Sequence, residues 1–163
     1  MIVGVTGHRF YDEPTASYLI VEVRELLSRW KADDGDLRLV SLLAEGADQL
    51  VASIAVDLDV PVDVVLPFEA YRESLEPEFR DELDRLLAVA ASVVTARDAE
   101  QGGDAYLAAG LEVVRRSDRL IAIWDGQEAR GTGGTGDIVE AAHAQGVDVV
   151  VLWPDGYVRV DAG

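Results

Sequence analysis

Ile2-Val-Gly-Val-Thr-Gly-His-Arg9 joins a short run of β-branched residues to a glycine turn that ends in two basic side chains. Similar apolar runs recur along the chain and alternate with longer stretches in which apolar residues repeat at helical spacing. This alternation is typical of βαβ units, in which helices cover both faces of a parallel sheet. The sequence therefore predicts an α/β fold, a three-layer α/β/α Rossmann-like domain with a mainly parallel sheet of about six strands.

The apolar runs and the periodic stretches define the expected elements. Nothing in the 163 residues resembles a linker between domains, so we expect a single domain, residues 1–163. We predict strands at Ile2–Val5, Leu37–Leu43, Val60–Leu66, Ala91–Thr95, Leu120–Trp124 and Val147–Leu152. We predict helices at Thr15–Trp30, Ala47–Leu58, Pro77–Ala90, Ala105–Arg116 and Gly136–Gln145.

The composition excludes several kinds of chemistry. The chain has no cysteine, so it has no disulfide, no thiolate metal site and no cysteine nucleophile. The longest apolar stretch, Leu86–Val94, is too short to span a membrane, and no secretory leader precedes the first predicted strand. We therefore expect a soluble, cytoplasmic protein with no membrane partner.

The formal net charge is -17, from 31 acidic and 14 basic residues spread along the chain. A surface of this sign repels polyanions, so we expect no nucleic acid among the partners. Small anions differ, because backbone amides and a few arginines can bind a phosphate inside a negative molecule. The expected partner is a nucleotide or another small phosphate-bearing ligand. Solubility alone would also account for the charge.

Polar, glycine-rich turns follow several of the predicted strands. Ligands of open parallel sheets bind outside the carboxyl ends of the strands, near the point where strand order reverses. Arg9 can bind a phosphate bidentately, His8 can donate a proton or a hydrogen bond, and Glu45 suits a ribose hydroxyl. Surface or capping roles are the alternatives for His8 and Arg9, and a place at the cap or in the first turn of the following helix is the alternative for Asp48. The ligand-binding residues predicted in these turns are Thr6, Gly7, Arg9, Glu45, Gly46, Asp48 and Asp125.

The richest glycine run, Arg130-Gly-Thr-Gly-Gly-Thr-Gly-Asp137, lies directly before a predicted helix. Its glycines can take positive φ and bring backbone N–H groups close to an anion, and the helix adds its positive end. A flexible loop without a ligand is the alternative. The residues predicted to bind a phosphate here are Gly133, Gly134, Thr135, Gly136 and Asp137.

Part of this run, Gly131–Gly136, also matches the dinucleotide fingerprint, with Asp155 about 20 residues further on. That fingerprint normally follows a strand directly and precedes a second mononucleotide-binding half, and neither condition holds in this chain. We therefore expect no nicotinamide or flavin cofactor. Glu140 and His143 have a spacing that metal ligands use, but no second such pair accompanies them, so we expect no metal.

Two groups of residues resemble known motifs. Thr132-Gly-Gly-Thr-Gly-Asp-Ile-Val-Glu140 resembles the Pro-Gly-Gly-x-Gly-Thr-x-x-Glu motif of the LONELY GUY proteins, which are nucleoside monophosphate phosphoribohydrolases. Gly4-x-Thr6-Gly7-His8-Arg9 and Ala44-Glu-Gly-Ala-Asp48 are similar to turns of the DNA-processing protein A and YpsA-like branches. These branches make up the SLOG superfamily of Rossmann-like nucleotide-binding domains. The similarity extends from Gly4 to about Leu152.

The resemblance implies roles for residues at the matching positions. It implies that the Gly133–Gly136 segment holds a phosphate, that Gly7 and Arg9 face this phosphate, and that Glu140 is the catalytic acid of a hydrolase. The hydrolase branch also implies an arginine, Arg115 or Arg116, and a homodimer. The sequence departs from the motif at two positions, where Thr132 replaces the proline and Asp137 replaces the threonine.

Three functions are compatible with these residues. The first is a binding domain for a nucleotide or nucleotide-derived small molecule, acting as a sensor or carrier. The second is a hydrolase of the N-glycosidic bond of a nucleoside monophosphate, with Glu140, Arg9 and His8 as catalytic residues. The third is an interaction module that uses the fold as a scaffold.

Overall fold

The structure, a computed structural model, describes residues 1–96, 103–128 and 134–156. All six predicted strands and all five predicted helices are present, with their ends shifted by up to a few residues. One further helix, α3, is too short to show a helical period in the sequence. In chain order the elements are β1 (Ile2–Gly7), α1 (Glu13–Asp33), β2 (Arg38–Ser41), α2 (Ala47–Asp57), β3 (Val62–Leu66), α3 (Tyr71–Ser74), α4 (Pro77–Val89), β4 (Ser92–Thr95), α5 (Gly103–Arg116), β5 (Arg119–Ile123), α6 (Thr135–Ala144) and β6 (Asp148–Leu152).

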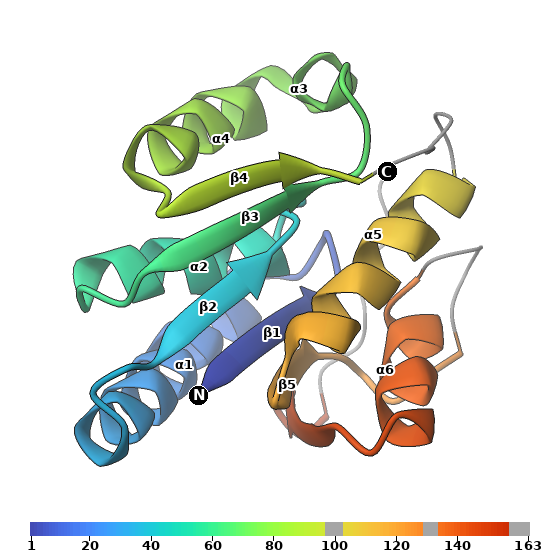
Figure 1. Ribbon diagram of the computed structural model, residues 1–163. Coiled ribbons are helices and arrows are strands. Elements are labelled where there is room, and N and C mark those ends of the chain that lie inside the picture. The colour runs from blue at the N-terminus through green and yellow to red at the C-terminus, as the bar shows by residue number, and fades with distance from the viewer. Residues whose placement is uncertain (97–102, 129–133, 157–163) are drawn as a thin grey trace.

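The strands form one sheet in the order β4-β3-β2-β1-β5-β6, and every neighbouring pair is parallel. The chain builds outward from β1 to β4 on one side and then returns to place β5 on the other side, so strand order reverses between β1 and β5. Helices α1, α2 and α4 pack in sequence on one face, and α5 and α6 pack together on the other (Figure 1). The predicted three-layer Rossmann-like fold is confirmed, with an entirely parallel sheet.

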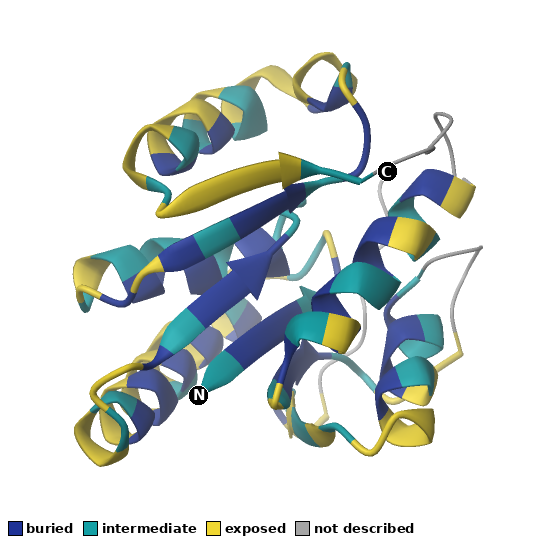
Figure 2. Cartoon of the chain, in the orientation of Figure 1, coloured by how far each residue is buried: buried dark blue, intermediate teal, exposed yellow. Residues whose placement is uncertain are grey.

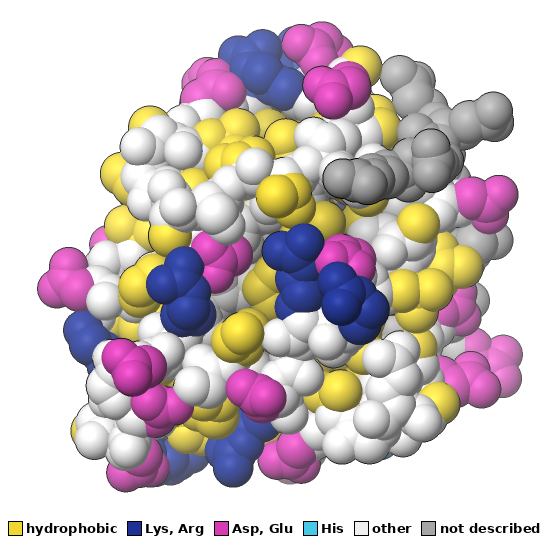
Figure 3. Space-filling view, in the orientation of Figure 1, with side chains coloured by type: hydrophobic (Ala, Val, Ile, Leu, Met, Phe, Trp, Pro, Cys, Tyr) yellow, Lys and Arg dark blue, Asp and Glu magenta, His cyan; other side chains and the backbone are white. Residues whose placement is uncertain are grey.

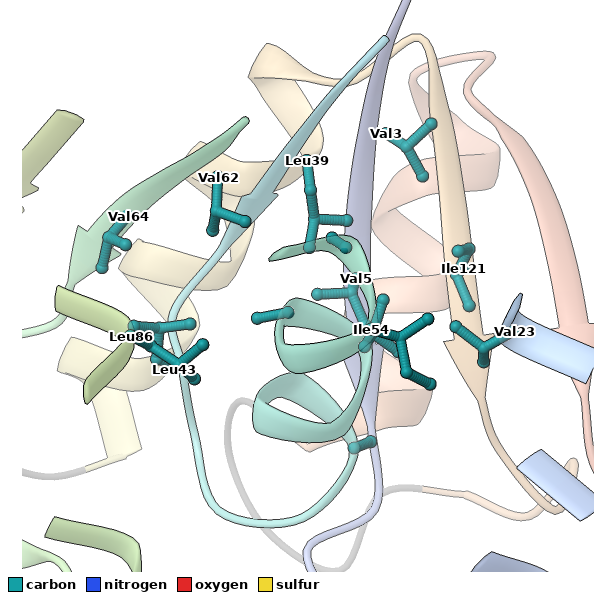
Figure 4. Close-up of a cluster of buried hydrophobic side chains, with 14 of the residues drawn as sticks. Val3, Val5, Val23, Leu39, Leu43, Ile54, Val62, Val64, Leu86 and Ile121 are labelled. Carbon is teal, nitrogen blue, oxygen red and sulfur yellow. The ribbon is translucent and has the colours of Figure 1, made fainter. Parts of the chain in front are cut away.

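The largest core cluster joins the central strands to α1, α2 and α4. Figure 2 shows that burial is concentrated in the central strands, whereas the edge strand β4 is mostly exposed. Figure 4 shows aliphatic side chains from the sheet and the helices meeting in this cluster. Burial of one such side chain contributes about 1.5–3 kcal/mol, so the cluster holds the carboxyl ends of the central strands in fixed positions. Its members include Val3, Val5, Val23, Leu39, Ile54, Leu86 and Ile121.

Two glycines bring the start of α2 against the end of β1. A Cβ atom on Gly7 would lie 2.4 Å from the Cβ of Ala47, and one on Gly46 would lie 2.2 Å from the carbonyl oxygen of Arg9. Gly46 also has a φ of 81°, a conformation that favours glycine. The Ala47 N–H donates to the carbonyl oxygen of His8 at 3.1 Å. The turns that follow β1 and β2 therefore form one tightly packed unit.

The helices show no membrane-spanning character. Within residues 1–96, 103–128 and 134–156, no helix is both long and apolar enough to cross a membrane. Even α1, with 21 residues, carries charged side chains along its length, among them Glu22, Arg24 and Glu25.

Candidate functional site at the carboxyl ends of β1 and β5

The end of β1 lies at the point where strand order reverses. Thr6 and Gly7 pair in register with Ala122 and Ile123 of β5. The pairing continues by one residue, because the N–H of His8 donates to the carbonyl oxygen of Ile123 at 3.0 Å. The predicted turn after the first strand therefore stands at the place where ligands of parallel α/β sheets bind.

A buried pair joins His8 to Asp125, the predicted site residue that follows β5. The Nε2 atom of His8 lies 3.1 Å from Oδ1 of Asp125 and accepts a hydrogen bond from the Asp125 N–H at 3.2 Å. The imidazole and the Trp153 ring system meet at nearly a right angle, with a centroid distance of 5.3 Å. A neutral ring accepts from the amide at Nε2, whereas a protonated ring donates to the carboxylate.

The turn after β5 orients the carboxylate of this pair. The N–H of Gln127 donates to Oδ1 of Asp125 at 3.0 Å, and Gly126 between them has a φ of 81°. The indole N–H of Trp124 donates to the carbonyl oxygen of Gln127 at 2.7 Å. These bonds hold the turn against the end of the sheet and keep Asp125 beside His8.

Arg9 follows His8 but points toward α5. Its guanidinium lies 5.4 Å from the ring centroid of Tyr106, within cation–π range, and the side chain is exposed. Its charge also acts on Asp48 and Tyr71, where it lowers both pKa values against larger opposing effects of burial. In this structure Arg9 therefore serves the half of the site formed by β2, β3 and α5.

Glu45 is buried and makes a contact with its own chain. Its Oε1 accepts a hydrogen bond from the N–H of Glu76, the N-cap residue of α4, at 3.0 Å. Such a bond satisfies a donor at a helix start, where intrahelical acceptors are missing. One oxygen of the carboxylate predicted to bind a ribose hydroxyl is thus engaged in holding α4.

Asp48 lies in the first turn of α2, as the alternative interpretation of this residue predicted. The carboxylate is buried and accepts a hydrogen bond from the Ser41 hydroxyl at 3.2 Å. Burial raises the pKa of Asp48 to about 7, although bonds from Ser41 and from the backbone of Ala44 and Leu42 lower it. The carboxyl group therefore fixes the loop between β2 and α2.

The predicted phosphate turn lies only partly within the described residues. Gly133 is outside them, whereas Gly134 is the N-cap residue of α6 and Thr135 is its first residue. Gly136 and Asp137 belong to the first turn of α6, and the N–H of Asp137 donates to the carbonyl oxygen of Gly134 at 3.1 Å. Because β1 and β5 are parallel neighbours, this helix start lies at the same edge of the sheet as His8.

Glu140 and His143 are exposed on α6. Glu140 lies one helical turn after Gly136, on the same side of the helix, and the opposite side packs into the core through Ile138 and Val139. The structure thus separates the three proposed catalytic residues by environment, since His8 is buried in a pair, Arg9 lies over a ring and Glu140 faces solvent. Across the described part of the chain, no cluster of three or more His, Asp or Glu side chains could hold a metal ion.

Sequence reasoning missed an aromatic cluster beside Arg9. The rings of Phe68, Tyr71 and Tyr106 meet edge to face, with centroid distances of 5.7, 5.9 and 6.0 Å. Phe68 lies two residues after the end of β3, and an aromatic residue near that strand end was the available signal. Tyr71 lies in α3, which the sequence did not predict, and Tyr106 arrives from α5. We name these three rings the aromatic cluster.

Comparisons of the sequence with known protein families and with curated proteins find no match. The fold, in contrast, matches solved structures. DNA processing protein A from Helicobacter pylori has a TM-score of 0.69 at 16% identity, over 98% of this chain and 68% of that one. DNA processing protein A from Streptococcus pneumoniae has a TM-score of 0.66 at 17% identity, over 91% of this chain. The present chain spans 49% of that protein's length. The structural-genomics target TM1055 has a TM-score of 0.57 at 17% identity, over 91% of this chain and 71% of that one.

One of these similarities corrects the prediction about partners. The Helicobacter pylori structure is described as showing a single-stranded DNA binding mode. The prediction that excluded nucleic acid from the partners is therefore wrong, because it treated the net charge of the whole molecule as decisive. Charge acts locally: Figure 3 shows Lys and Arg side chains gathered near the middle of one face, beside acidic ones. Single strands also bind through base stacking, which net charge does not oppose.

The similarities at this level of identity concern the fold. The six-stranded parallel sheet agrees with the Rossmann-like fold that the sequence resemblance implied. By its fold, this chain is a Rossmann-like α/β protein similar to DNA processing protein A.

Proposed function

We propose that this chain binds a nucleotide or nucleotide-derived molecule at the carboxyl ends of β1 and β5, as a sensor or carrier. The observation that carries the proposal is the buried His8–Asp125 pair at the strand-order reversal, at the edge of the sheet where α6 also begins. Both come from turns that follow adjacent parallel strands. Ligands of open α/β sheets bind at this position.

The start of α6 suits the phosphate of such a ligand. Gly134 and Gly136 flank Thr135 at this helix start. Because neither glycine has a side chain, a ligand can approach the first N–H groups of the helix closely. N–H groups and the positive end of the helix dipole together favour an anion. Arg9 would supply a positive charge beside this edge of the sheet.

The structural neighbours widen the class of ligand. DNA processing protein A binds single-stranded DNA in the Helicobacter pylori structure, and a single strand presents the same phosphates and bases as a free nucleotide. We therefore include a short oligonucleotide with the mononucleotides as a candidate ligand.

A charge placed in the helix start tests the phosphate site. Gly136→Asp puts a carboxylate in the first turn of α6, where it favours the helix but repels a phosphate. We expect the Kd for AMP, GMP or a dT oligonucleotide, measured by isothermal titration calorimetry, to be at least tenfold higher than in the wild type. Gly136→Asn is the matched uncharged control and should bind like the wild type. Equal binding by both variants would place the phosphate elsewhere.

Incubation of the protein with AMP or GMP distinguishes binding from hydrolysis. Glu140 stands one turn after Gly136, a placement that keeps the second function, N-glycosidic hydrolysis, open to a direct test. If the protein only binds its ligand, AMP and GMP stay intact over hours. Chromatography of the free base measures this. Release of base that Glu140→Gln abolishes would replace the binding function with hydrolysis.

A further inference from the structure

The aromatic cluster lies apart from the His8–Asp125 pair, on the side of β2 and β3. Phe68 follows β3, Tyr71 belongs to α3 and Tyr106 belongs to the first turn of α5. Since β3 lies two strands from β1, the cluster stands about 10 Å from the end of β1 along the sheet. That spacing is comparable with the reach of a nucleotide from its phosphate to its base.

The face of Tyr106 accepts a planar group. The three rings contact one another at interplanar angles of 82°, 90° and 68°, so the contacts within the cluster are edge to face rather than stacked. The guanidinium of Arg9 lies over Tyr106 at 5.4 Å, and the Arg9 side chain is exposed. A nucleobase is likewise planar, and bases stack on aromatic side chains in proteins that bind nucleic acid.

A buried hydroxyl beside this face lacks a hydrogen-bond partner. Tyr71 is 1% exposed, and its Oη atom makes no hydrogen bond with any residue that the structure describes. Buried polar groups in proteins are nearly always paired, so such a group indicates a partner supplied from outside the chain. Burial raises the pKa of Tyr71 well above its ordinary value, which keeps the hydroxyl protonated and able to donate.

The acidic groups near Tyr71 are already engaged. Asp48 accepts from Ser41, and Glu45 accepts from the N–H of Glu76. The charges of Asp48, Glu45 and Arg9 all act on the Tyr71 hydroxyl, which places this hydroxyl within reach of the same strand ends. Neither carboxylate bonds to the Tyr71 hydroxyl in the part of the chain that the structure describes.

We infer that the face of Tyr106 is the stacking platform for the base of the nucleotide, and that the Tyr71 hydroxyl bonds to a polar edge of that base. Arg9 covers the platform in the free protein and leaves it for the ligand. The inference rests on the proposed function and names its base-binding half. It gives Tyr106 and Tyr71 binding roles that the sequence did not assign.

The test compares a ligand with a base and a ligand without one. Titration calorimetry of AMP and of ribose 5-phosphate measures both Kd values for each variant. Tyr106→Leu keeps an apolar side chain but removes the π-face, so we expect AMP to bind about 5- to 150-fold more weakly. Ribose 5-phosphate should change less than about twofold. Tyr18→Leu on the exposed side of α1 is the matched control and should change neither constant.

The second variant is Tyr71→Phe, which removes only the hydroxyl. Because that hydroxyl has no partner in the free protein, the Tm should not fall, whereas AMP should bind several-fold more weakly. A lower Tm with unchanged AMP binding would make Tyr71 a purely structural residue and overturn its assignment.

The outcomes separate the inference from the function on which it rests. If the wild type binds none of the three ligands, AMP, ribose 5-phosphate and a dT oligonucleotide, the proposed function fails and the inference fails with it. If it binds AMP and ribose 5-phosphate equally, and Tyr106→Leu affects neither, the proposed function stands and the base platform is overturned. An AMP-specific loss in Tyr106→Leu supports both.

Discussion

At the scale of single residues, the site depends on close approaches that only particular side chains permit. The turn after β1 and the start of α2 meet at Gly46, where a Cβ atom would overlap the carbonyl groups of Arg9 and His8. One residue on, the N–H of Ala47 bonds to His8. A change at this contact therefore reaches both basic residues of the predicted site.

Gly46→Ala should destabilise the fold and displace Arg9. The methyl group meets backbone at 2.2 Å, and the φ of 81° is strained for alanine, so we expect a loss of about 2–4 kcal/mol in the free energy of unfolding. Urea denaturation followed by circular dichroism measures it. Gly35→Ala is the control, because a Cβ there meets nothing within 4 Å and should change stability by less than about 0.5 kcal/mol.

Asp48 should give the stability a defined pH dependence. Burial raises its folded-state pKa from 3.8 to about 7, so the folded protein holds this proton more tightly than the unfolded chain does. The stabilisation is complete below about pH 4 and is lost as the pH rises through about 7. Asp48→Asn cannot titrate, and relative to the wild type it should gain about 2–3 kcal/mol between pH 5 and pH 8.

Urea titrations at several pH values measure this difference. Asp57→Asn, at the exposed end of α2, is the control and should run parallel to the wild type over the same range. A pH-independent difference between Asp48→Asn and the wild type would mean that Asp48 stays ionised throughout.

At the scale of elements, the helices are held at their starts by residues from other turns. Glu45, after β2, accepts a hydrogen bond from the N-cap residue of α4, Glu76. Gln49 of α2 donates to the carbonyl oxygen of Phe79 in the same helix α4. The turn after β2 thereby positions the layer of helices beside the candidate site.

Removal of the Glu45 carboxylate should loosen the start of α4. Glu45→Ala leaves the Glu76 N–H without its acceptor, and we expect a loss of about 1 kcal/mol in stability. The rate of hydrogen exchange should increase more in the first turn of α4 than in α2. Glu45→Gln keeps an acceptor oxygen and should retain most of the protection, while Glu69→Ala, exposed in the loop after β3, should change nothing. Faster exchange spread evenly over the whole molecule would contradict this role.

At the scale of the whole molecule, a net charge of -17 surrounds a site that we propose for phosphates. Long-range repulsion and local binding then act in opposite directions. The correction about nucleic acid follows from the same point, because the sum of charges governs approach, whereas the groups at the site govern the bound state.

Salt should therefore speed association of a mononucleotide. The phosphate of AMP carries about -1.5 to -2 charges, and salt screens its repulsion by the acidic surface. We expect the association rate constant, measured by stopped flow, to rise between 20 and 200 mM NaCl. Ribose 5-phosphate carries the same phosphate and should show the same trend. An association rate that falls with salt would indicate a local positive field that outweighs the total charge.

The sequence by itself determined the fold class and most element positions. Apolar periodicity is a local signal, and the runs around Val3, Leu39 and Ile121 became strands as predicted. The glycine turns were also visible, since only glycine satisfies the conformation and the close approach at Gly46. The polar residues after the strands could also be named, because the predicted strand ends mark their positions in the sequence.

Only the tertiary structure decided what those polar residues do. It paired His8 with Asp125, assigned Glu45 and Asp48 to contacts with the chain itself, and set Arg9 over Tyr106. These contacts join residues from separate strand ends, and their geometry depends on strand order, which the local pattern does not encode. The aromatic cluster escaped prediction because its rings come from three elements that meet only when the sheet has formed.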